Sequence, residues 1–60
     1  VKKLEIYSRW GRLVFDKTNY SNEWHGQNNK GEKLPDGTYF YLIIYNNLET
    51  VNGWIFVNGN

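Results

Sequence analysis

Six carboxylates and one histidine are the side chains through which this chain could perform acid–base chemistry. The carboxylates are those of Glu5, Asp16, Glu23, Glu32, Asp36 and Glu49. General acid–base catalysis needs groups positioned together at one reacting bond, whereas these six are separated along the chain, three of them directly beside a lysine or a turn glycine. Such acids are the ordinary exposed charges and turn caps of a protein surface. His25 lies in a Trp-His-Gly turn, which favours a structural role. The sequence therefore predicts no catalytic residue and a protein that is not an enzyme.

The composition also argues against a bound metal or cofactor. The 60 residues include no cysteine and a single histidine, so neither a disulfide framework nor a thiolate metal site can form. Lysine and arginine are scattered and the net charge is +1, which predicts no basic surface for nucleic acid. The longest apolar run covers residues 39–45, far fewer than the roughly 20 residues that cross a bilayer. We predict one domain, residues 1–60, without a metal, a cofactor, bound nucleic acid or a membrane span.

Aromatic rings are the remaining candidates for a ligand surface, because Trp and Tyr stack on sugars and on bases. They make up 18% of the chain, and a chain this short also needs them for its core. We assign to the core Trp24, Tyr39, Tyr41, Trp54 and Phe56. Trp10 differs, because it falls at a predicted hairpin tip where the turn does not require a ring. It either stacks with Arg9 over the end of the fold or contacts a partner.

Short strands must position these rings. Residues 1–8 alternate between apolar and polar side chains, which is the period of a half-buried strand, and residues 13–15 form a second strand. Gly11, between them, can take the left-handed conformation that closes a hairpin turn. Residues 16–23 are rich in Asn, Ser, Thr and Asp, which bond to the local backbone, so they predict an irregular connection held in place by Tyr20.

Two polar turns and two longer strands complete the pattern. Residues 27–31 predict a reversal that ends at Gly31, and residues 34–37 predict a tight turn before a strand over residues 38–45. That strand is β-branched and aromatic almost throughout, which indicates a central strand covered on both faces. A turn at residues 46–47 then leads to a last strand over residues 50–57, with Gly53 inside it as a bulge or a close approach. The alternative places the turn at Asn52-Gly53 and the partner strand at residues 48–51.

These elements predict an all-β protein. No segment has the 3.6-residue apolar period of a helix. Four or five short strands with turn signals every 8 to 12 residues or so are typical of a small immunoglobulin-like antiparallel β-sandwich. A small barrel of the SH3 or cold-shock type gives a similar pattern.

Several short motifs follow one another in a distinctive order. They are Arg9-Trp10-Gly11, Trp24-His25-Gly26, Gly31, Pro35-Asp36-Gly37-Thr38-Tyr39 and Gly53-Trp54. In this order and spacing the chain resembles the gliding-motility-associated C-terminal domain, the type B sorting domain of the type IX secretion system of Bacteroidetes. The residues that match as structural positions are Tyr7, Gly11, Trp24, Gly26, Gly31, Pro35, Gly37, Tyr39, Tyr41, Gly53 and Trp54. We assign Gly11 and Gly37 to folding alone, as sites of positive φ.

The resemblance implies a non-catalytic signal at the C-terminus of large secreted or cell-surface proteins such as adhesins. Its implied partners are the outer-membrane translocon and a PorP/SprF-like outer-membrane protein, and its cargo is exported across the outer membrane. We expect the contact to be made by Arg9 and Trp10 or by a sheet edge. The alternative is a structural immunoglobulin-like or carbohydrate-binding module of an extracellular protein.

The chain departs from the family pattern in three places. It lacks the Pro-Asn-Gly-Asp-Gly type of segment before the first strand and begins with Val1 instead of Met, so we expect an excised, N-terminally truncated domain without its N-terminal strand. It ends in Asn58-Gly59-Asn60 where the family often has a basic residue. His25 stands where Asp or Asn is usual, which removes a carboxylate cap from that turn.

Overall fold

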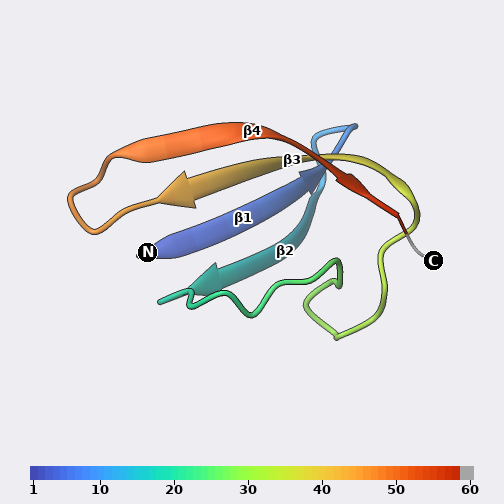
Figure 1. The fold of residues 1–60 in the computed structure, drawn as a ribbon, viewed down its shortest axis with the longest axis horizontal. Coiled ribbons are helices and arrows are strands. Elements are labelled where there is room, and N and C mark those ends of the chain that lie inside the picture. Colours follow the sequence, from blue (N-terminus) through green and yellow to red (C-terminus); the bar gives the residue numbers. More distant parts are fainter. Residues whose placement is uncertain (59–60) are drawn as a thin grey trace.

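Alternating apolar residues along the chain form one antiparallel sheet of four strands in the computed structural model, which describes residues 1–58. The strands are β1 (Lys3–Ser8), β2 (Leu13–Thr18), β3 (Gly37–Ile44) and β4 (Thr50–Val57). Their order across the sheet is β2-β1-β3-β4 (Figure 1). The predicted all-β, antiparallel fold is confirmed, and β2 and β4 are the two edges.

Both hairpins form where the sequence predicts them. The β3–β4 turn is closed by the Tyr45 amide, which donates to the Glu49 carbonyl at 2.9 Å. The predicted last strand over residues 50–57 is therefore confirmed, and the alternative turn at Asn52-Gly53 is wrong, because both residues lie inside β4. β2 runs three residues past the predicted end at Phe15. These polar residues favour a loop locally, but pairing with β1 gives their backbone hydrogen bonds that outweigh this preference.

The connection from β2 to β3, residues 19–36, is a loop layer beside and beneath the sheet (Figure 1). It reverses at residues 28–31, as predicted, where the Gly31 amide donates to the Asn28 carbonyl at 3.0 Å. The Trp24 ring lies 6.3 Å from the Phe15 ring, and its indole N–H donates to the Gln27 carbonyl at 2.7 Å. This loop is the second layer of a sandwich-like arrangement in which residues 1–58 supply only one sheet.

The core lies between this loop and one face of the sheet. Its buried members are Leu4, Ile6, Phe15, Leu34, Tyr39 and Val57. Trp24 and Tyr41, both predicted as core residues, pack against it while remaining partly exposed. No helix, and so no helix able to cross a bilayer, is found in the described part of the chain.

The other face of the sheet is uncovered. Of the β3 residues that point to it, Thr38 is exposed and the others are only half-buried. The side chains of Trp54 and Phe56 are 62% and 66% exposed. The predictions that residues 38–45 are covered on both faces and that Trp54 and Phe56 belong to the core are therefore wrong. An apolar run shows that a strand can be buried on both faces, but not that another part of the chain packs on each face. Here the 19–36 loop packs on the opposite face only.

Candidate functional site

The β1–β2 turn, residues 8–12, holds the two predicted contact residues on a well-bonded backbone. The Gly11 amide donates to the Ser8 carbonyl at 2.9 Å. The Ser8 hydroxyl oxygen accepts the amides of Trp10 and Arg12, each at 3.2 Å. Gly11 has φ +86°, a conformation that side chains disfavour. The turn is therefore fixed by its own backbone and leaves the side chains at its tip free for other contacts.

Arg9 and Trp10 form the exposed tip of this turn. The Arg9 guanidinium carbon lies 4.8 Å from the centre of the Trp10 ring, which is a cation–π arrangement. The stacking of Arg9 on Trp10 is therefore present, as the first alternative states, and the contact with a partner stays a prediction. The Trp10 side chain is 82% exposed, so this stacking covers nothing beneath it. A ring held in water beside a guanidinium is the kind of surface through which proteins bind other proteins.

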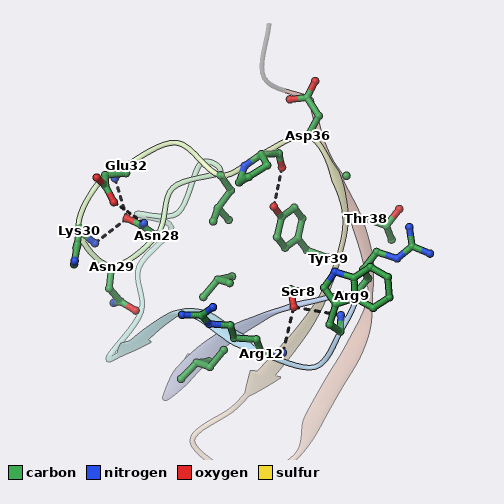
Figure 2. A pocket seen from close by; sticks show the side chains of 16 residues that line it. Ser8, Arg9, Arg12, Asn28, Asn29, Lys30, Glu32, Asp36, Thr38 and Tyr39 are labelled. Carbon is green, nitrogen blue, oxygen red and sulfur yellow. Dashed lines mark hydrogen bonds between the residues drawn. The ribbon is translucent and has the colours of Figure 1, made fainter.

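A cleft of about 670 Å³ opens between this tip, the 28–32 turn and the start of β3 (Figure 2). Tyr39, one of two buried residues that line it, donates its hydroxyl to the Pro35 carbonyl at 2.7 Å. Burial, and then the charge of Asp36, raise the pKa of Tyr39 above its usual range. In the 28–32 turn the Asn28 side-chain oxygen accepts the amides of Lys30 and Glu32, each at 2.9 Å. The Tyr39 hydroxyl and the Asn28 side chain thus stabilise the backbone turns that build the cleft.

The cleft is lined by charged, polar and apolar side chains. Its lining residues include neither histidine nor cysteine, and the hydroxyl oxygen of Ser8 is engaged by two amides. His25 lies in the exposed part of the 19–36 loop, where its amide donates to the Gln27 side chain at 2.7 Å. Within residues 1–58, no three His, Asp or Glu side chains gather as metal ligands would. The arrangement offers a surface for binding.

A second, shallow hollow of about 310 Å³ lies on the uncovered face of the sheet. It is lined by Tyr7, Ser8, Arg9, Gly11, Phe40 and Trp54. The rings of Phe40 and Trp54 meet edge to face at 5.1 Å between centres. The Tyr7 hydroxyl donates to Glu5 at 3.0 Å, and this bond raises the pKa of Tyr7, with burial and the Glu5 charge adding to it. Arg9 therefore connects the tip to the uncovered aromatic face.

The structure brings some of the predicted motif residues together and separates others. Arg9, Trp10, Pro35, Gly37 and Tyr39 line the cleft. Tyr41 faces Gly53 across the β3–β4 pair, which confirms a close approach and not a bulge at Gly53. Tyr7, Gly11 and Trp54 line the hollow on the uncovered face. Trp24, Gly26 and Gly31 lie in the 19–36 loop.

Two features of this surface were not predicted from the sequence. Phe40 pairs with Trp54 because β3 and β4 place them opposite each other, which the alternation along each strand could have suggested. The side-chain amide of Asn29 makes two bonds to the backbone of Asp16: its oxygen accepts from the Asp16 amide at 3.0 Å, and its nitrogen donates to the Asp16 carbonyl at 2.8 Å. No sequence signal gives this contact, because it joins residues from a turn and a strand that meet only in the folded chain.

Comparison with known proteins agrees with the order of motifs in the sequence. The family model of the CHU_C type IX secretion signal domain matches residues 1–57. Neither the curated proteins nor the solved structures include a match to this chain. Domains of this family mark proteins that are exported across the outer membrane to the cell surface or the medium. The resemblance is thereby confirmed, and the chain belongs to the CHU_C family of type IX secretion signal domains.

Proposed function

We propose that this domain is a non-catalytic C-terminal sorting signal that docks a large secreted or surface protein, such as an adhesin, onto the type IX secretion machinery at the outer membrane. The match of the family model over residues 1–57 is the observation that carries this proposal. The proposed partners are the translocon and a PorP/SprF-like outer-membrane protein. The surface described above offers binding groups and no catalytic set, which agrees with a docking role.

Within this function, Arg9 and Trp10 are the proposed contact with the machinery. Trp and Arg are the residue types that most often dominate binding energy at protein interfaces. Trp10 is 82% exposed, and Ser8 holds the turn rigid through the amides of Trp10 and Arg12. A rigid tip loses little conformational freedom on binding, so more of the contact energy appears as affinity.

Export of a fused reporter tests this role. A reporter carrying the domain at its C-terminus is expressed in a bacterium with a type IX system, and the exported fraction is measured. In the double variant Arg9→Ala/Trp10→Ala we expect export to fall about tenfold or more, because a contact of this kind contributes about 2 kcal/mol. Leu48→Ala is the matched control, since Leu48 is also a large exposed side chain, in the turn at the opposite end of the sheet.

The outcomes separate the tip from the function. Circular dichroism of the variants first verifies that the sheet is retained. Unchanged export of the folded Arg9→Ala/Trp10→Ala fusion excludes the tip as the contact. Equal export of the reporter without the domain excludes the sorting function itself.

A further inference from the structure

The two edges of the sheet differ in how they are protected from another strand. At the β2 edge, the Asn29 side chain accepts from the Asp16 amide at 3.0 Å and donates to the Asp16 carbonyl at 2.8 Å. It occupies the backbone groups that a further strand would use. β2 also contains the charges of Asp16 and Lys17 and an irregular register opposite Ile6 and Tyr7. Charges, bulges and side-chain covers are the devices that keep sheet edges from pairing.

The β4 edge has none of these devices. Thr50–Val57 contains no charged residue and no proline. Its register with β3 is continuous over all eight residues, and no strand among residues 1–58 pairs with its outer side. Within residues 1–58, the outer side of this strand is therefore unpaired along its whole length.

The hydrogen-bond pattern shows which backbone groups are available. Tyr45 and Glu49 form a bonded pair at the turn, and bonded and non-bonded pairs alternate in an antiparallel ladder. Residues 51, 53, 55 and 57 therefore bond to β3, while the amides and carbonyls of residues 50, 52, 54 and 56 point away from the sheet. Two of these outward residues, Trp54 and Phe56, also have largely exposed side chains, at 62% and 66%.

We propose that the outer edge of β4 receives an extended, uncharged segment of the outer-membrane partner as a fifth strand of the sheet. The inference rests on the proposed sorting function and names the part of the domain that the partner binds. An extended polypeptide is the occupant with the right chemistry, because only a backbone offers donors and acceptors in the spacing of the four outward residues. A lipid surface could cover the exposed rings but could not satisfy these amides.

Charge decides what kind of segment fits. A strand added beside β4 places its side chains against Trp54 and Phe56 on one face and against Val51 and Ile55 on the other. A charged side chain there would lose its hydration without gaining a partner of opposite charge. Alternating apolar or small polar side chains are therefore expected in the partner's segment.

The proposed edge is continuous with the tip. The hollow on the uncovered face joins Arg9 and Gly11 of the tip to Trp54 of β4. A partner strand along β4 would thus end beside the Arg9–Trp10 pair, and one partner could contact both.

Proline substitution at matched positions of the two edges tests this inference. Asn52→Pro removes an outward amide from β4, and proline is tolerated where the amide of an edge strand faces solvent. Thr18→Pro is the control, because Lys2 and Asn19 form a bonded pair, so that the amide of Thr18 also points outward, from β2. In the type IX export assay with the fused reporter, we expect Asn52→Pro to lower export about tenfold or more and Thr18→Pro to leave it near the wild-type level.

A second variant covers the case in which Asn52→Pro does not fold. Phe56→Lys keeps the backbone and places a charge on the docking edge, and the same loss of export is expected. Wild-type export by a folded Asn52→Pro or Phe56→Lys fusion overturns the inference, as does an equal loss in Thr18→Pro.

Two further measurements keep the inference separate from the function and from self-pairing. If the reporter without the domain is exported as well as the intact fusion, the sorting function is excluded and the inference with it. Sedimentation of the purified fusion tests a second copy as the occupant. A dimer of the wild-type fusion that Asn52→Pro abolishes assigns the edge to self-pairing and overturns the proposal of a partner segment.

Discussion

At the scale of single residues, Gly53 has a packing role that differs from that of the turn glycines. It lies opposite Tyr41 in the β3–β4 pair, and a Cβ built on it would lie 2.8 Å from the Tyr41 hydroxyl oxygen and 3.0 Å from Cζ. The ring of Tyr41 therefore covers the backbone at Gly53. A side chain at this position would meet the ring of Tyr41.

Gly53→Ala is expected to destabilise the domain. The Tyr41 ring must shift to admit the methyl group, and overpacking of this kind costs about 1–3 kcal/mol. Urea unfolding measures the change in the free energy of unfolding. The control is the same substitution in a Tyr41→Leu background, where the ring is absent and the cost should disappear. An equal cost in both backgrounds contradicts the close-approach explanation.

At the scale of elements, the turns and strands were predictable where the signal is local. Gly11 marks a real left-handed turn, and the β3–β4 turn and the last strand lie where their residues predict. The uncovered face was not predictable from Trp54 and Phe56, because whether a ring is buried depends on which face the 19–36 loop covers. That choice is made by contacts between distant segments, such as Trp24 with Phe15.

The same distinction applies to the candidate site. The exposed Arg9–Trp10 pair was predictable because a hairpin tip leaves its side chains outside the sheet. The protection of the β2 edge by Asn29 was not, because a polar turn residue has no local sign of a strand partner.

Asn29→Ala is expected to detach the 19–36 loop from the β2 edge. Each lost hydrogen bond at this exposed site contributes about 0.5–1.5 kcal/mol, and the Asp16 amide loses its acceptor. Hydrogen exchange of that amide should accelerate. Asn47→Ala is the control, since Asn47 also makes two bonds, but only within its own turn to Glu49. Unchanged exchange at Asp16 in Asn29→Ala contradicts the edge-protecting role.

At the scale of the whole molecule, one sheet with a loop on one face leaves the other face to water. Small domains bury a small share of their surface and are marginally stable, so single hydrogen bonds such as that from Tyr39 to Pro35 carry weight. The uncovered face and the open β4 edge lie next to each other and next to the tip. A partner strand on the β4 edge would therefore lie beside both the uncovered face and the tip.

The pKa values of two tyrosines predict that the domain loses stability in alkali. The pKa of Tyr7 is raised in the folded state, chiefly by its hydrogen bond to Glu5, and that of Tyr39 is raised, chiefly by burial. The unfolded chain therefore releases these protons first, near the usual tyrosine pKa of about 10. Above that pH the unfolded state binds fewer protons than the folded state, so the free energy of unfolding falls as pH rises. Below it, the stabilising contribution of both phenols is fully present.

Urea unfolding between about pH 8 and pH 11 measures this dependence. In Tyr39→Phe the free energy of unfolding at neutral pH should be about 1 kcal/mol lower, because the Pro35 carbonyl loses its donor. It should also fall less steeply as the pH rises. Tyr7→Phe should reduce the decline as well, since its phenol is the other group with a raised pKa. An undiminished alkaline decline in the Tyr7→Phe/Tyr39→Phe double variant assigns the effect to other groups. A reduced decline shows that two phenols make the stability of the whole sheet depend on pH. They are Tyr7 in β1, which is bonded to Glu5, and the buried Tyr39 near the start of β3.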